Sequence, residues 1–253
     1  MKKDKDNLGS RMKENYENRA KTFLTRRTPV LLRLDGKAFH TFTKGMNRPF
    51  DKLLIETMQE TTKFLCENIQ GCKIGYTQSD EITLLVTDYD KLGTDAWFDY
   101  NVQKMCSISA SLATLAFNRI FREKAITSGL DLYINKIDKA MFDSRCFNIP
   151  KEEVVNCFIW RQQDATKNSI SMVAQYYFSD KELHGKNGSV KQDMLMLQNG
   201  VNWNDFSPTE KRGSCVVKVE SEGRNKWVID LNTPIFSKER EYIDKFLQMG
   251  EYL

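Results

Sequence analysis

The stretch LLRLDGKAFHTF, residues 31–42, runs from apolar residues into an abrupt Asp-Gly step at Asp35 and Gly36. A short apolar run that ends at a turn signal is typical of a buried strand, so residues 29–36 are predicted to form one. An Asp-Gly pair is, on its own, a common turn sequence. A carboxylate at a strand end can also bind a metal ion while the amides that follow bind phosphate.

The composition excludes several classes of protein. The 253 residues carry a net charge of +4 and are 40% apolar, which is enough for a substantial core. No apolar run approaches the length of a membrane span and no secretory signal is visible, which predicts a cytoplasmic protein without membrane association. The six cysteines form no CxxC pair, so a structural zinc site is not expected. The small net charge predicts that phosphate binding depends on local basic patches, such as Arg26-Arg27 and Lys211-Arg212.

The order of predicted elements gives the fold class. Strands are predicted over 29–36, 72–78, 81–87 and 143–149, and helices over 8–24, 51–70 and 95–121. From residue 29 to 149 this is strand, helix, strand, strand, helix, strand, the β-α-β-β-α-β order of a ferredoxin-like sheet and an α+β fold. After Pro150 the pattern predicts a helix to about 178, a hairpin around Glu222-Gly223 and a last helix over about 237–249. We therefore expect a sheet domain with an N-terminal helix over 1–150, and a helical and hairpin extension packed on it over 151–253.

The predicted strand order brings carboxylates together. The first strand, ending at Asp35, and the strand that begins at Glu81 are neighbours, so Asp35, Asp80 and Glu81 are expected at one edge of the sheet. Like charges that close repel each other, and Mg²⁺ removes the repulsion by binding carboxylates together with substrate phosphates. A pair of such ions suits phosphoryl transfer. Each motif alone is more often an ordinary turn, and only their convergence favours chemistry.

At this point the sequence resembles a known family, the tRNA-His guanylyltransferases and their guanylyltransferase-like relatives, which are 3′–5′ polymerases. The resemblance rests on five segments in the family's order: RLDGKAFHTF (33–42), GYTQSDEITLL (75–85), FDSRCFNIP (142–150), WRQQDA (160–165) and RGSCV (212–216). It implies a polymerase-like palm with two Mg²⁺ ions, ATP and GTP or another NTP as substrates, tRNA as partner, and a homo-tetramer. Such enzymes activate an RNA 5′-monophosphate with ATP or GTP. The 3′-hydroxyl of an incoming NTP then attacks the activated end, and pyrophosphate leaves.

The resemblance also implies roles for individual residues. Asp35 and Asp80 would bind the metal ions, with the Gly36 carbonyl assisting and Glu81 supporting the catalytic site. The residues implied to cradle a triphosphate are Gly36, Lys37, Ala38, Phe39, His40, Ser79 and Asp80. Those implied to contact RNA or to act in the activation step are Arg48, Arg161, Asn168 and Lys191.

One segment departs from the eukaryotic enzymes. They carry His-Ile-Asn-Asn-Leu-Tyr-Asn-Thr where this chain has TKNSISMV (166–173), which keeps only Asn168. This segment is similar to that of bacterial, archaeal and phage-type relatives, which favour template-dependent repair of truncated tRNA 5′ ends. We therefore expect template-dependent 3′–5′ addition to tRNA, including G addition to tRNA-His.

Three alternatives remain open. A strict tRNA-His guanylyltransferase would add G to that tRNA alone, and a palm-type nucleotide cyclase would need no RNA. A non-catalytic RNA-binding module is disfavoured, because the central strands LLRLDG (31–36) and ITLLVT (82–87) offer no aromatic residue for base stacking.

Overall fold

The computed structural model describes residues 7–221 and 223–248 of the chain. It has an α+β fold built on one sheet with the strand order β4-β1-β3-β2-β5-β6, in which neighbouring strands are antiparallel. The strands are β1 (Val30–Gly36), β2 (Cys72–Gln78), β3 (Glu81–Val86), β4 (Phe142–Asn148), β5 (Ser214–Ser221) and β6 (Arg224–Asp230). Because β5 pairs with β2, the C-terminal hairpin extends the sheet that the first four strands form.

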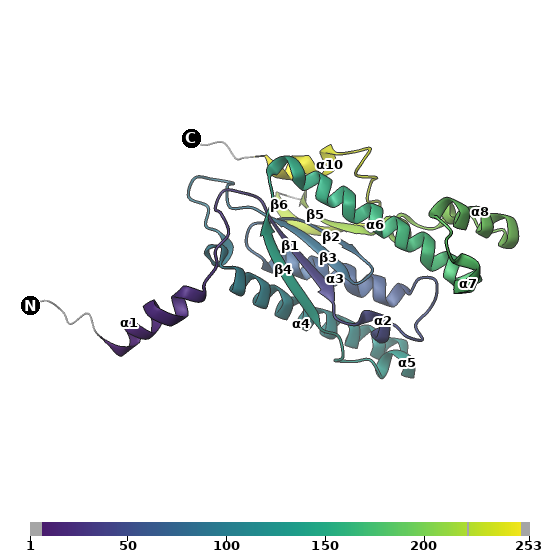
Figure 1. Cartoon of the computed structure of the whole chain (residues 1–253), viewed down its shortest axis with the longest axis horizontal. Helices are drawn as coiled ribbons and strands as arrows, with labels where there is room; N and C mark the ends of the chain where they lie inside the picture. Colours follow the sequence, from purple (N-terminus) through teal and green to yellow (C-terminus); the bar gives the residue numbers. More distant parts are fainter. Residues whose placement is uncertain (1–6, 222, 249–253) are drawn as a thin grey trace, which may run out of the picture.

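Helices cover both faces of the sheet (Figure 1). α3 (Lys52–Asn68) and α4 (Val102–Ser128) lie on one face, and α6 (Lys151–Tyr177) lies on the other. The shorter helices are α1 (Leu8–Met12), α2 (Phe39–Phe42), α5 (Asp131–Ile134), α7 (Asp180–Leu183), α8 (Gly188–Asn199), α9 (Pro208–Arg212) and α10 (Glu241–Asp244). No helix in the described part of the chain is long and apolar enough to cross a membrane.

Alternation along the strands builds a core on each face of the sheet. Leu32 and Leu34 of β1 pack in the core that includes α4, whereas Leu31 packs against α6. The α4 side contains an aromatic cluster whose neighbouring ring centroids lie 5.0 to 5.7 Å apart. Its members are Phe39, Phe42, Phe117, Phe121 and Phe142. Phe39 and Phe42, which follow the Asp-Gly step, are therefore core residues that pack the loop after Gly36 against α4.

This aromatic cluster also explains the glycine of the Asp-Gly step. A Cβ atom on Gly36 would lie 2.3 Å from Cδ2 of Phe39, which is closer than non-bonded carbon atoms approach. Only glycine lets the ring of Phe39 fold back against the strand end. The step thus has a packing reason, whatever chemistry Asp35 performs.

Three predicted helices differ from the structure. The helix predicted over 95–121 begins at Val102, because Phe98 and Asp99 are left-handed (φ 52° and 51°) and the Asn101 side chain caps the helix by accepting from the Lys104 amide. The last helix is reduced to short turns over Glu241–Asp244 and Lys245–Leu247, and residue 249 lies outside the described residues. The N-terminal helix is regular only over Leu8–Met12 and continues as exposed turns to Ala20.

Phe117→Ala should lower the free energy of unfolding by about 3–5 kcal/mol, because it removes the fully buried ring at the centre of the aromatic cluster. Leu115→Ala on the same helix is the matched control, since Leu115 is 61% exposed and its loss should change stability by less than about 0.5 kcal/mol. Urea unfolding followed by circular dichroism measures both. Equal losses in the two variants would contradict the assignment of this core.

Candidate active site

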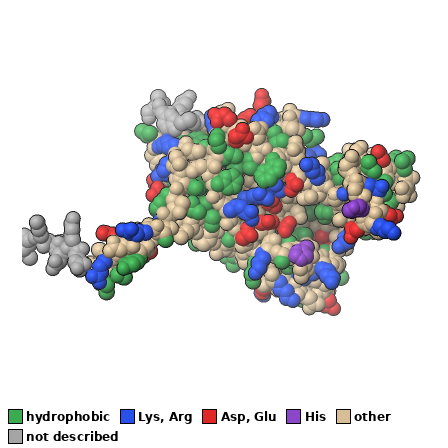
Figure 2. Space-filling model, viewed as in Figure 1, with side chains coloured by type: hydrophobic (Ala, Val, Ile, Leu, Met, Phe, Trp, Pro, Cys, Tyr) green, Lys and Arg blue, Asp and Glu red, His purple; other side chains and the backbone are tan. Residues whose placement is uncertain are grey.

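The pairing of β1 with β3 brings the predicted carboxylates together. Asp35 lies directly opposite Glu81 in the register, and the Gly36 amide donates a hydrogen bond to the Asp80 carbonyl at 3.1 Å. Asp35 and Asp80 are both half-buried. In Figure 2 acidic and basic side chains meet near the centre of this face of the molecule, beside a hollow. The expected convergence at one edge of the sheet is therefore present.

The environment of Asp80 opposes its negative charge. Burial raises the pKa of Asp80, and the nearby Asp35 carboxylate raises it further. The Ser79 hydroxyl, which donates to Asp80 Oδ1 at 3.1 Å, acts in the opposite direction. A bound cation would relieve the repulsion between the two aspartates, so the donor set fits a cation.

The side chains among the described residues restrict which protein ligands a cation could have here. No group of three or more His, Cys, Asp and Glu residues among them is placed to hold a metal ion. A cation at this edge would thus have Asp35, Asp80 and backbone oxygens as protein ligands. Mg²⁺ is usually bound in this way, by one or two carboxylates with water and substrate phosphates completing its shell.

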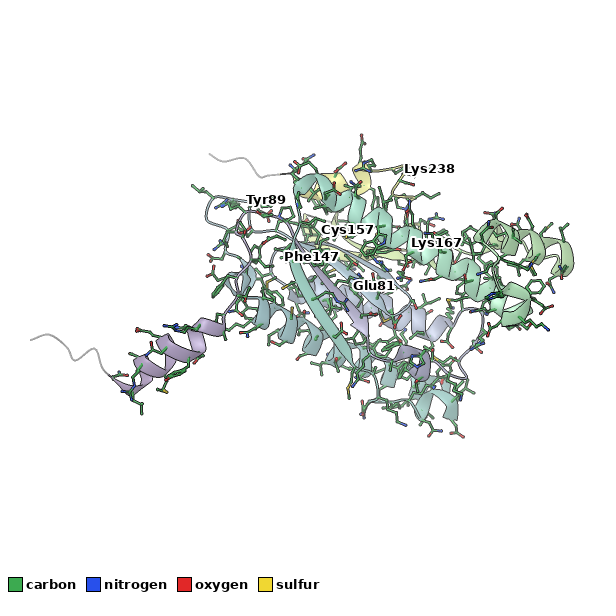
Figure 3. The ribbon with its side chains drawn as sticks, in the orientation of Figure 1. Glu81, Tyr89, Phe147, Cys157, Lys167 and Lys238 are labelled. Atoms are coloured by element: carbon green, nitrogen blue, oxygen red, sulfur yellow. The ribbon has the colours of Figure 1, made fainter. Side chains whose placement is uncertain are left out.

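The Glu81 carboxylate is hydrogen-bonded to two arginines. Its Oε2 accepts from Arg33 of β1 at 2.8 Å, and its Oε1 accepts from Arg161 of α6 at 2.6 Å. Arg161 also donates to Asp164 at 2.8 Å. Figure 3 labels Glu81 near the centre of the molecule. Because both carboxylate oxygens are hydrogen-bonded, Glu81 is held in place, and it fixes the position of the first residue of β3.

The loop after Asp35 presents backbone amides. The Lys37 amide donates to the Met141 carbonyl at 2.8 Å, and Ala38 is left-handed (φ 54°) where it begins α2. The first amides of a helix, here those of Phe39 and His40, have no acceptor within the helix and can bind an anion. His40 has an exposed side chain, whereas Phe39 is buried and offers only its backbone.

The remaining predicted residues are spread more widely. Ser79 and Asn168 both line a small cavity of about 90 Å³ beside the carboxylates. Arg48 is exposed in the loop before α3 and does not line that cavity, nor does Lys191, which is on α8 and bonds to Ser171 at 3.0 Å. Arg161 is 4% exposed and fully engaged with acidic partners, so in this structure its side chain is not presented to an RNA. These RNA contacts stay predictions.

Two residues at the site were missed by sequence reasoning. Arg33 holds Glu81, and Asp143 of β4 lies opposite Asp35 in the register. Arg33 could have been found, because a basic residue two positions before Asp35 must share its face of the strand. The segment FDSR, residues 142–145, contains Asp143, but its register with β1 is not visible in the sequence.

Asp80→Asn should raise the melting temperature of the free protein at pH 7 in EDTA. The folded state raises the pKa of Asp80, so folding favours the protonated carboxyl, and stability falls as the pH rises from the unfolded pKa through the folded one. The ionised group therefore destabilises the protein at neutral pH, and the benefit of the variant should shrink toward pH 4. Scanning calorimetry measures it, with the exposed Asp95→Asn as control. A variant that melts at or below the wild-type temperature would contradict the assigned repulsion.

Comparison with known proteins identifies the family. Residues 9–150 match the family model described as tRNAHis guanylyltransferase, Thg1. A bacterial tRNA(HIS) guanylyltransferase (Thg1)-like protein in complex with ATP is 49% identical with a TM-score of 0.87, over 96% of this chain and 99% of that chain. A similar structure, in complex with GTP, is 47% identical with a TM-score of 0.81 over the same shares, 96% and 99%. The tRNA(His) guanylyltransferase of Kluyveromyces lactis is 27% identical over 203 residues, 75% of this chain and 82% of that protein. This chain belongs to the tRNAHis guanylyltransferase family and is a nucleotidyltransferase.

Proposed function

We propose that this protein adds nucleotides in the 3′–5′ direction to the 5′ end of tRNA, directed by the opposite strand. The observation that carries the proposal is the pair of half-buried carboxylates, Asp35 and Asp80, beside a loop of free amides in a chain of this family. The two similar solved structures are described as complexes with ATP and with GTP, which supports both nucleotides as substrates.

The strand order supports a polymerase-like palm as the catalytic part. The strand order β4-β1-β3-β2, with α3 and α4 packed on one face, supports the proposal of a ferredoxin-like sheet. We propose residues 1–150 as the palm and 151–253 as an extension that covers its other face with α6 and lengthens the sheet by the hairpin of β5 and β6.

We assign separate roles to the residues near Asp35 and Asp80. Asp35 and Asp80, with the Gly36 carbonyl, would hold two Mg²⁺ ions, which when bound stabilise the charge that develops on the reacting phosphate. The free amides of α2, with His40 and Ser79, would receive the triphosphate. Glu81, held by its arginines, keeps Asp80 facing Asp35. Glu81 and its two arginines are bonded to one another before substrate arrives, and groups fixed in this way lower a barrier without reorganising.

We also propose that the protein works as a cytoplasmic homo-tetramer. The N-terminal segment supports self-association, because it exposes three large apolar residues. These are Leu8 at 65%, Met12 at 42% and Tyr16 at 67% of their accessible surface. Figure 1 shows this segment extending away from the body of the molecule, where a second copy could cover it.

Asp35→Asn and Asp80→Asn should each reduce nucleotide addition by at least about a thousandfold, because each removes a charged ligand that stabilises every phosphoryl step. The matched control is Asp95→Asn, which changes an exposed carboxylate near the opposite end of the sheet from Asp35 and should keep near wild-type activity. The assay extends a labelled, 5′-monophosphorylated, 5′-truncated tRNA with Mg²⁺, ATP and all NTPs. Near wild-type addition by either site variant would refute the metal assignment, and nucleotide cyclisation without RNA would establish the cyclase alternative.

The base opposite the vacant position should select the added nucleotide. A mismatched base leaves hydrogen-bonding groups unpaired in a closed site, which is a strong source of discrimination. Two tRNAs shortened by one residue test this, one that needs G and one that needs a different base, each offered all four NTPs. We expect the complementary nucleotide in both, with addition ending when the acceptor stem is filled. Addition of G to tRNA-His alone, whatever the opposing base, would establish the strict guanylyltransferase alternative.

A further inference from the structure

A larger cavity, of about 540 Å³, lies on a different flank of α6 from the carboxylate pair. We call it the Lys167 cleft. The residues that matter to the argument are Gln163, Lys167, Trp203, Lys211, Arg212 and Ser237. Figure 3 labels Lys167 on α6 and Lys238 on the segment after β6, and the neighbouring Ser237 of that segment lines the cleft. Its volume falls in the range of small-molecule and nucleotide sites, about 300–1,000 Å³.

The Lys167 cleft is lined by basic side chains and by no acidic ones. Lys167, Lys211 and Arg212 line it, and none of its lining residues is an aspartate or a glutamate. Lys167 is exposed and forms no ion pair with the carboxylates of residues 7–221 and 223–248. Arg212 is held in place because its Nε donates to the Thr233 carbonyl at 2.7 Å. Cations gathered without counter-charges attract phosphate, and guanidinium and ammonium groups bind it with strong charge-assisted hydrogen bonds.

The neutral groups of the cleft suit a base. The indole of Trp203 is half-buried and fixed, because its N–H donates to Ser169 Oγ at 3.0 Å, and Lys211 Nζ lies 5.7 Å from its ring centroid. The exposed amide of Gln163 can donate to and accept from the edge of a base. An aromatic ring, an amide and several cations together form the usual set for an unpaired nucleotide of RNA.

The walls of the cleft are built before any ligand binds. Gln162 is 4% exposed, its Nε2 donates to the Pro234 carbonyl at 2.8 Å, and its Oε1 accepts from the Phe236 amide at 2.9 Å. These bonds hold the segment after β6 against α6. The motif WRQQDA therefore contributes to two places. Arg161 and Asp164 belong to the hydrogen-bond network of Glu81, whereas Gln162 and Gln163 line the cleft.

We propose that the Lys167 cleft binds an unpaired nucleotide of the RNA substrate, away from its reacting 5′ end, with the phosphate on the three cations and the base on Trp203 and Gln163. This inference rests on the proposed RNA substrate. Arg212 also lines the small cavity that Ser79 lines, so the cleft and that cavity share one basic residue. The cleft thus adds affinity for RNA without taking part in the chemistry.

The test compares Lys167→Glu with Lys151→Glu, the same change at an exposed position in the first turn of the same helix. Fluorescence anisotropy with a labelled, 5′-truncated tRNA, without NTPs, measures RNA affinity over a series of salt concentrations. Lys167→Glu should bind about tenfold more weakly at low salt, the factor expected for one lost charge-assisted contact. Its salt dependence, as the slope of log K against log salt, should fall by about one phosphate contact.

Two further measurements, together with the comparison above, decide the assignment. ATP and GTP affinities of Lys167→Glu should equal those of the wild type; loss of NTP binding with unchanged RNA affinity would overturn the RNA assignment. Equal RNA affinity in the Lys167→Glu and Lys151→Glu variants would overturn the proposal altogether. Asp35→Asn should keep wild-type RNA affinity, so a failure of nucleotide addition is distinguished from a failure of the cleft.

Discussion

One buried carboxylate, Glu81, joins the sheet to the helix that covers it. Arg33 from β1 and Arg161 from α6 each bond to one of its oxygens, so three separate elements meet at a single charge. A buried ion pair adds little net stability against an apolar alternative, but removing one partner is costly because the other charge is left unpaired. The contact therefore specifies one arrangement of β1, β3 and α6. Asp80 precedes Glu81 directly, so the direction of the carboxylate that we propose as catalytic depends on the same network.

Most of the sheet could be predicted from local pattern. The apolar runs and their turn signals gave β2 with its exact bounds and β1, β3 and β4 within one residue at each end. The start of α4 could not be predicted in this way, because Trp97 and Phe98 are apolar and fit a helical period although Phe98 is left-handed. The place of the C-terminal hairpin was equally hidden, since its pairing of Thr77 with Ser214 joins residues far apart in the chain.

The candidate site shows the same difference. Contacts between strands predicted to be neighbours could be predicted from the sequence, and contacts between distant segments could not. Asp35 and Asp80 could be placed together because the predicted strand order already implied that their strands are neighbours. The partners of Glu81 could not, because Arg161 lies 80 residues further along the chain and reaches it only after α6 packs on the sheet. The residues after Gly36 had one meaning in the sequence, a phosphate loop. In the structure the same residues also build the core, since the rings of Phe39 and Phe42 pack there.

The double use of that loop has a genetic consequence. Phe39 packs against Phe117 with ring centroids 5.4 Å apart, so the amides that would receive phosphate are attached to the aromatic cluster. A substitution that loosens the cluster shifts the loop before the whole domain unfolds, and the effect grows with temperature as the marginal stability is lost. A screen for temperature-sensitive alleles should therefore recover changes at Phe117 and Phe121. Neither residue belongs to the loop, yet the packing of Phe117 on Phe39 and of Phe121 on Phe42 should set the temperature at which the loop keeps its shape.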